Sequence, residues 1–172
     1  VSRYPVRKGG SMALRLTERR WAIQVCNSIN AWATTVDSIV KSAGGEHGLR
    51  DDSGALFPDV VLFGDGAQAM VVQGWELKLP DTPVNDPDLL ANAERKARAL
   101  GLASFVVWNV NNAVLYSIST IERQQVKSWS LAVQVDRDGV ADSPWRNLLE
   151  EMLTDITEFI SRGAIQIGRA HV

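Results

Sequence analysis

Two neighbouring stretches decide the fold: FPDVVLF at residues 57–63 and GWELKLP at residues 74–80. Each is a short apolar run bounded by glycine or proline, which is typical of a buried strand. The segment GDG at residues 64–66 lies between them and favours a turn. The spacing therefore predicts a hairpin with strands over residues 60–63 and 69–79.

Three charged side chains interrupt these apolar strands. Asp59 stands at the start of the first strand, and Glu76 and Lys78 lie late in the second. Because side chains alternate between the two faces of a strand, Glu76 and Lys78 are expected to point the same way. Two carboxylates and an ammonium at one spot are what metal-assisted phosphodiester cleavage requires. The sequence therefore predicts a nuclease site, although Glu-x-Lys alone also fits a solvated strand face.

The remaining elements follow from the spacing of apolar residues. A repeat of three or four positions predicts amphipathic helices from residue 17 to about 40 and from residue 143 onward. Asp86 and Pro87 are expected to open a third helix, which Gly101 closes. Gly44 and Gly45 are expected to end the first helix. Further strands are predicted over residues 105–108, 113–118 and, more weakly, 126–135, and residues 46–55 are predicted to form a loop or a short edge strand.

This order of elements, helix, strand, strand, helix, strand, strand, helix, predicts an α/β fold. The crossover from residue 79 through a helix to residue 105 is expected to be a right-handed parallel unit. We therefore expect a three-layer sandwich with a central mixed β-sheet flanked by helices.

Composition limits the classes of function. The chain has 172 residues, with 45% hydrophobic and 22% charged residues, which suits one globular domain. With one cysteine, Cys26, and two histidines, a zinc site of the usual kind is excluded, so any catalytic metal should be a hard cation held by oxygens. The sequence has no apolar run that could span a bilayer and no signal-peptide pattern, so a cytoplasmic protein is expected.

The net charge of −2 is unfavourable for a domain that grips DNA alone. We therefore expect another region to supply part of the binding. Residues 17–163 are expected to form the domain, and residues 1–16 a disordered or non-native arm. The segment IGRAHV at residues 167–172 resembles the translation of a common sequencing-library adapter, so residues 164–172 are expected to be a non-native tail.

On Pro58-Asp59, on Glu76-Leu77-Lys78 and on the helix and strand that follow, the chain resembles the PD-(D/E)XK nuclease superfamily, the fold of many restriction endonucleases. More narrowly, residues 56–63, 74–83 and 92–97 (NAERKA) are similar to nuclease domains at the N-terminus of restriction-modification proteins that also carry an adenine DNA methylase. The resemblance implies a restriction endonuclease-like sandwich, an endodeoxyribonuclease activity, and a C-terminal methylase or DNA-recognition region in the full-length protein.

The resemblance also implies roles for individual residues. Asp59 and Glu76 would ligate Mg²⁺, for which Mn²⁺ can substitute, together with the backbone carbonyl of Leu77. Lys78 would orient or deprotonate the attacking water. Many members add a glutamate from upstream, and the sequence offers Glu18 and Glu46. The alternatives are a first-turn acid favoured by the helix dipole and a solvated loop residue.

Several alternatives stay open from the sequence. Arg95 and Lys96 could contact DNA phosphates, but the sequence favours a solvated helix face for them. Cleavage of both DNA strands requires a homodimer or sequential nicking, and the sequence does not choose between them. The alternative function is a catalytically inactive DNA-binding or scaffold domain of the same fold. A third hypothesis is a metal-dependent hydrolase that acts on nucleotides.

Overall fold

The computed structural model describes residues 16–45 and 57–170, with side chains up to residue 163. Its strands lie in one sheet in the order in which they occur along the chain. The helices are α1 (Glu18–Ala33), α2 (Pro87–Ala99) and α3 (Trp145–Ala170), with a 3₁₀ turn at Arg137–Gly139. The strands are β1 (Ser42–Gly45), β2 (Val60–Phe63), β3 (Val71–Leu77), β4 (Ser104–Trp108), β5 (Asn112–Ile118) and β6 (Arg123–Ser130).

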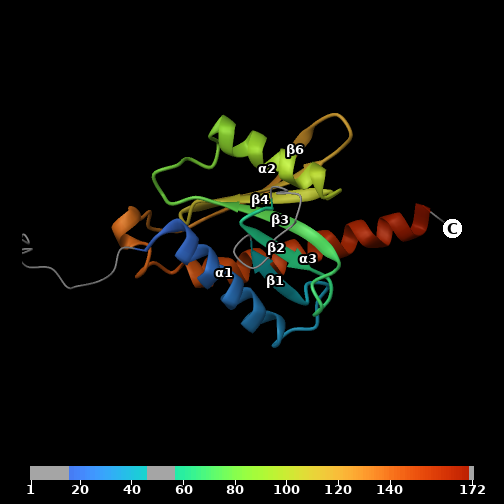
Figure 1. The fold of residues 1–172 in the computed structure, drawn as a ribbon, viewed down its shortest axis with the longest axis horizontal. Helices are drawn as coiled ribbons and strands as arrows, with labels where there is room; N and C mark the ends of the chain where they lie inside the picture. The colour runs from blue at the N-terminus through green and yellow to red at the C-terminus, as the bar shows by residue number, and fades with distance from the viewer. Residues whose placement is uncertain (1–15, 46–56, 171–172) are drawn as a thin grey trace, which may run out of the picture.

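The sheet is the middle of three layers (Figure 1). Helix α2 covers one face, and α1 and α3 lie across the other. The pair β3–β4 is parallel and the remaining neighbours are antiparallel, so the sheet is mixed. The predicted α/β class, with a mixed sheet between helices and a parallel crossover through α2, is confirmed.

The hairpin predicted from the first two stretches is present. Strand β2 has the predicted bounds, and β3 lies within the predicted range. Asp65 organises the turn, because its carboxylate accepts hydrogen bonds from the backbone N–H groups of Ala69 and Met70 at 3.0 Å. An acidic side chain that satisfies successive N–H groups is a common way to fix a turn.

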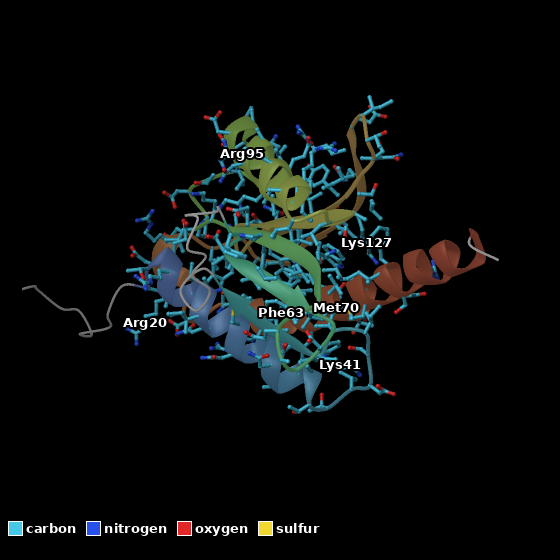
Figure 2. The ribbon with its side chains drawn as sticks, turned by 45° about the vertical axis from the view of Figure 1, so that its right-hand side comes forward. Arg20, Lys41, Phe63, Met70, Arg95 and Lys127 are labelled. Carbon is cyan, nitrogen blue, oxygen red and sulfur yellow. The ribbon has the colours of Figure 1, made fainter. Side chains whose placement is uncertain are left out.

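A cluster of tryptophans fills the space between the sheet and the helices α1 and α3. Trp21 and Trp145 come from the helices, and Trp75 and Trp108 come from the sheet, all fully buried. The rings of Trp21 and Trp108 meet edge to face with centroids 4.8 Å apart. On the opposite face, a smaller apolar layer packs under α2, with Leu89, Ala93 and Ala97 against strands β4 and β5. Arg20 on α1 and Arg95 on α2 mark these two opposite sides (Figure 2).

Helix α1 ends at Ala33, earlier than the apolar spacing predicts. The hydroxyls of Thr34 and Thr35 donate to the carbonyls of Ala31 and Trp32, each at 2.7 Å. These bonds satisfy carbonyls at the end of the helix, where a further turn would otherwise be needed. The prediction that Gly44 and Gly45 end this helix is wrong.

Both glycines instead form part of the edge strand β1, where Gly44 pairs with Val61. A Cβ at Gly44 would lie 3.2 Å from the Gln68 amide and 3.3 Å from the Phe63 ring, so close packing favours glycine here. The predicted loop over residues 46–55 lies outside the described residues.

The later elements agree in kind with the prediction and differ in extent. Strand β6 begins at Arg123 and ends at Ser130, earlier than predicted, and only Trp129 in it is buried. Leu16, which falls in the predicted arm, is buried at 8% exposure. Helix α3 continues through Ala170, so the backbone of the predicted tail extends this helix. Over the described ranges, no helix is both long and apolar enough to cross a membrane.

Candidate active site

The alignment of β2 with β3 brings Asp59 and Glu76 together. Val60 lies opposite Trp75 in the antiparallel register, so the position before Val60 lies opposite the position after Trp75. Side chains of directly opposed residues project from the same face of a sheet. The Oδ2 atom of Asp59 also accepts a hydrogen bond from the Leu77 N–H at 2.8 Å. The two carboxyls are therefore cross-strand neighbours, and the Asp59 charge acts on Glu76.

Pro58 sets the approach of Asp59 to the sheet. A Cβ placed on Gly74 would lie 2.7 Å from the Cγ atom of Pro58, which is closer than such atoms pack. Glycine at position 74 therefore lets the proline ring lie against β3. The buried ring in turn holds the neighbouring Asp59 at the head of β2.

Glu76 is buried under α2 and pairs with a lysine of that helix. Its exposed fraction is 4%, and its Oε1 atom lies 2.8 Å from Nζ of Lys96. Burial raises the pKa of Glu76 to about 7, and the neighbouring Asp59 charge adds to this rise while Lys96 opposes it. A buried carboxylate needs such a partner, because an uncompensated charge in the interior is strongly unfavourable.

Lys78 and Glu18 complete the group at its more open side. The Nζ atom of Lys78 lies 3.7 Å from Oε1 of Glu18, and both side chains are partly exposed, at 38% and 41%. Thr17 caps α1 by accepting from the Arg20 N–H at 3.1 Å, which places Glu18 in the first helical turn. Partial burial raises the pKa of Glu18, with Lys78 lowering it and Asp59 adding to the rise.

The structure therefore brings four of the predicted residues into one neighbourhood, with Leu77 at the end of β3 between two of them. They come from the first turn of α1, the residue before β2, the strand β3 and the residue after it: Glu18, Asp59, Glu76 and Lys78. The other upstream glutamate, Glu46, lies outside the described residues. Glu18 does lie at the group, where it contacts Lys78.

The donor set fits a hard cation. Asp59 and Glu76 offer carboxylate oxygens, and the Leu77 carbonyl belongs to the residue that Asp59 contacts. Oxygen donors of this kind suit Mg²⁺, which keeps several of its waters and binds few protein carboxylates. Among the residues whose placement is described, no group of three or more His, Cys, Asp or Glu side chains could hold a metal. Two carboxylates with backbone and water oxygens are therefore the set that the site offers.

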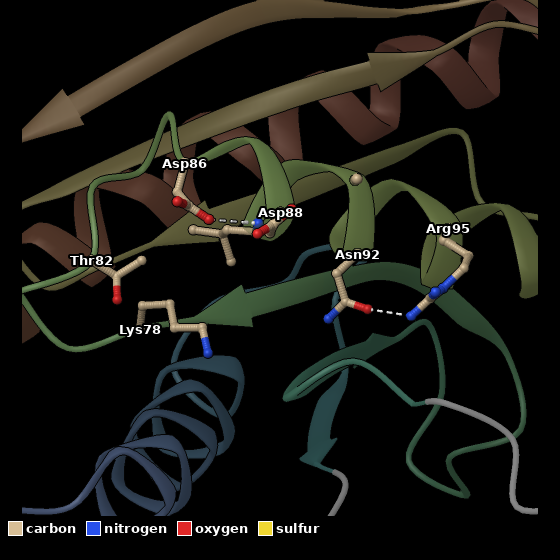
Figure 3. Close-up of a pocket in the computed structure, with 8 residues that line it drawn as sticks. Lys78, Thr82, Asp86, Asp88, Asn92 and Arg95 are labelled. Atoms are coloured by element: carbon tan, nitrogen blue, oxygen red, sulfur yellow. Dashed lines mark hydrogen bonds between the residues drawn. The ribbon is translucent and has the colours of Figure 1, made fainter.

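A hollow of about 720 Å³ lies beside this group, between the end of β3 and helix α2. Lys78 reaches into it from β3, and Asn92 and Arg95 line it from α2 (Figure 3). Arg95 is exposed and donates from Nη2 to Oδ1 of Asn92 at 2.6 Å. Asp86 and Asp88 also line the hollow, so its charge is mixed.

Lys96 does not lie where the sequence reading placed it. With an exposed fraction of 8%, it points into the protein and does not belong to a solvated or phosphate-contacting helix face. A signal for this was present in the sequence, because Lys96 falls within the apolar stripe of α2. The stripe consists of positions spaced by three or four residues: Leu89, Ala93, Lys96, Ala97 and Leu100. A lysine in such a stripe indicates a buried acidic partner.

Cys26 does not contribute to the chemistry. It is buried in α1, and burial raises the pKa of its thiol to about 12. A thiol with so high a pKa is not a nucleophile at neutral pH. Its place in an apolar stretch of the sequence is typical of a buried thiol.

Comparison with known proteins adds no relative. No protein-family model matches this chain, and neither a curated protein nor a solved structure does. What the site can do is therefore inferred from its own residues.

Proposed function

We propose that this domain is a Mg²⁺-dependent DNA endonuclease with a restriction endonuclease-like fold, serving as the cleavage module of a larger restriction-modification enzyme. The observation that supports this best is the cross-strand pair of carboxylates, Asp59 and Glu76, with Lys78 directly after the end of β3. Glu18 and Lys78 lie at the open side of the pair, and Lys78 lines the hollow of about 720 Å³ beside it.

Each residue has a distinct task in this mechanism. Asp59, Glu76 and the Leu77 carbonyl would hold the cation, which when bound polarises the scissile phosphate and lowers the pKa of a bound water. Lys78 projects from the end of β3 and donates a hydrogen bond to the attacking water or to a phosphate oxygen. Glu18 forms an ion pair with the Lys78 ammonium, with Nζ and Oε1 3.7 Å apart, and so limits the positions that the lysine can take.

The surroundings favour a polymer substrate over a small one. Lys78 is partly exposed, and the hollow beside it is bordered by surface residues of α2. Arg95 lies on this border, is exposed and donates to Asn92, so its guanidinium can also contact a phosphate outside the reacting one. Because the chain carries a net charge of −2, we propose that a further region of the full-length protein strengthens DNA binding.

Plasmid nicking tests the proposal directly. The intact chain should convert supercoiled plasmid to open circles with Mg²⁺ or Mn²⁺ and should lose this activity with EDTA. Glu76→Gln should lower the rate by at least about a hundredfold, since it removes a carboxylate that the chemistry needs. Glu150→Gln, which alters an exposed glutamate of α3, is the matched control and should leave the rate unchanged. Activity that survives both EDTA and Glu76→Gln would refute the assignment.

A second candidate is an inactive DNA-binding or scaffold domain of the same fold. The Lys96–Glu76 ion pair favours it, because it provides Glu76 with a cationic partner without any metal. This candidate predicts that the chain retards DNA in a gel equally strongly in Mg²⁺ and in EDTA. It also predicts that Glu76→Gln does not change this retardation and that the wild type does not nick DNA.

A further inference from the structure

We propose that Lys96 is the internal counter-ion of the Asp59–Glu76 pair: its ammonium supplies to Glu76 part of the compensating charge that a bound divalent cation would also supply. This inference rests on the proposed function. It makes Lys96 a positioning residue, which acts through the Glu76 carboxylate and not on the substrate.

The first observation is the packing of charge under α2. Glu76 is 4% exposed and lies opposite Asp59 across the β2–β3 ladder, so two carboxylates approach each other in a place with little water. Both carboxylates can stay ionised in the folded protein only if positive charge lies nearby. In this structure Lys96 supplies that charge at 2.8 Å.

The second observation is the position of Lys96, which faces the interior of the protein. It belongs to the apolar stripe of α2, and its side chain is 10% exposed. The other basic residues of α2 have different partners: Arg95 donates to Asn92, and Arg98 pairs with Glu94. Lys96 therefore does not reach solvent or a bound polymer.

The third observation concerns the atoms of Glu76. The Lys96 contact is made to Oε1, and a carboxylate has a second oxygen with its own lone pairs. Lys96 can therefore fix the rotamer of Glu76 through one oxygen and leave the other oxygen available as a ligand. A bound divalent cation would then use the same carboxylate as the ammonium, and each would supply part of the compensating charge.

Thermal unfolding of the full chain tests this sharing. The proteins compared are the wild type, Lys96→Met, Glu76→Gln and the double variant, each in EDTA and in excess MnCl₂ or MgCl₂. In EDTA, Lys96→Met should have a lower Tm than the wild type, because Asp59 and Glu76 then lack the Lys96 ammonium as a counter-ion. The rise in Tm caused by metal should be at least about twofold larger for Lys96→Met than for the wild type, since metal now supplies the missing charge.

The remaining variants serve as controls. The double variant should recover most of the Tm lost in EDTA and should respond little to metal, because the buried charge is gone. Arg95→Met, which removes a neighbouring but exposed cation, should change neither the Tm nor the metal response. Lys96→Gln keeps a hydrogen-bond donor without the charge and should behave as Lys96→Met does. If Lys96→Met is unfolded in EDTA, it should refold when MnCl₂ is added.

Equal metal-induced shifts in the wild type, Lys96→Met and Lys96→Gln would overturn the inference, because the ion pair would then be purely structural. Variants that stay unfolded with and without metal would also overturn it. Nicking separates this failure from failure of the proposed function. A wild type that nicks DNA through Glu76 while the Tm shifts are equal refutes only the counter-ion role. A wild type that neither nicks nor responds to metal refutes both.

Discussion

The Glu76 carboxyl lies beside Asp59 and Lys96, and its burial raises its pKa from 4.5 to about 7. Since the folded-state pKa is above the unfolded one, the folded protein binds more protons between these two values. Stability contributed by this protonation is present at the acidic end of the window and is lost as the pH rises through it. The direction is opposite to that of an ordinary exposed ion-paired acid.

This gives a prediction for stability against pH. In EDTA, the free energy of unfolding of the wild type should fall more steeply between pH 4.5 and about 7 than that of Glu76→Gln, which cannot titrate at this position. Urea unfolding of both proteins across that range measures the two slopes. Parallel slopes would mean that the carboxyl keeps an ordinary pKa in the folded state.

A second residue-scale prediction concerns Asp59. Asp59→Asn keeps an oxygen that can accept from the Leu77 N–H, whereas Asp59→Ala leaves that buried N–H without its partner. The alanine variant should therefore be less stable than the asparagine variant by about 1–2 kcal/mol in urea unfolding. Both should lose nicking. An alanine variant as stable as the asparagine one would show that this hydrogen bond does not hold the strand end.

Among the elements, the contact between strand β3 and Pro58 can be tested by adding one methyl group at Gly74. Gly74→Ala places a Cβ at 2.7 Å from the rigid Pro58 ring, so the chain must shift, and we expect a loss of about 1–3 kcal/mol. Gly66→Ala is the matched control, because nothing lies within 4 Å of its added Cβ, and it should stay within about 0.5 kcal/mol. Chemical unfolding gives both values, and equal effects would argue against the Pro58 contact.

Local signals in the sequence were enough for most elements. The apolar run at β2, bounded by Pro58 and Gly64, and the Asp86–Pro87 start of α2 were each predicted correctly, because a few adjacent residues determine them. The end of α1 and the strand β1 were missed. Both depend on contacts that spacing does not show: the threonine hydroxyls that satisfy helix carbonyls, and the pairing of Gly44 with Val61.

The candidate site divides in the same way. Strand alternation and hairpin register predict the positions of Asp59, Glu76 and Lys78. The structure brings Asp59 and Glu76 together and places Lys78 beside Glu18. For Lys96 the sequence predicts a surface position, because a charged side chain usually lies in solvent, and the structure shows it buried. Its partner lies twenty positions away in the sequence, so only the packing of α2 on the sheet identifies the pair.

For the molecule as a whole, the sheet joins the two apolar layers, so we expect them to unfold together. Leu89→Ala, in the layer under α2, should lower the free energy of unfolding by about 2–5 kcal/mol. Tryptophan fluorescence reports the opposite layer, because Trp21, Trp75, Trp108 and Trp145 are buried there. Its transition should shift with the far-UV circular dichroism transition.

Val133→Ala is the control for this experiment, since Val133 is 76% exposed and should change little. A Leu89→Ala variant whose circular dichroism shifts while its fluorescence midpoint stays fixed would mean that the layers come apart independently.

The pairing of Val60 with Trp75 has one more consequence. Sliding β3 by a single residue would turn Glu76 toward the tryptophans and put Leu77 in its place under α2, and the tryptophan layer would not tolerate the unpaired buried charge. A molecule that has folded has therefore also assembled its acidic pair. A substitution at Asp59 or Glu76 can therefore remove the acidic pair, whereas a shift of the strand register would also disrupt the fold.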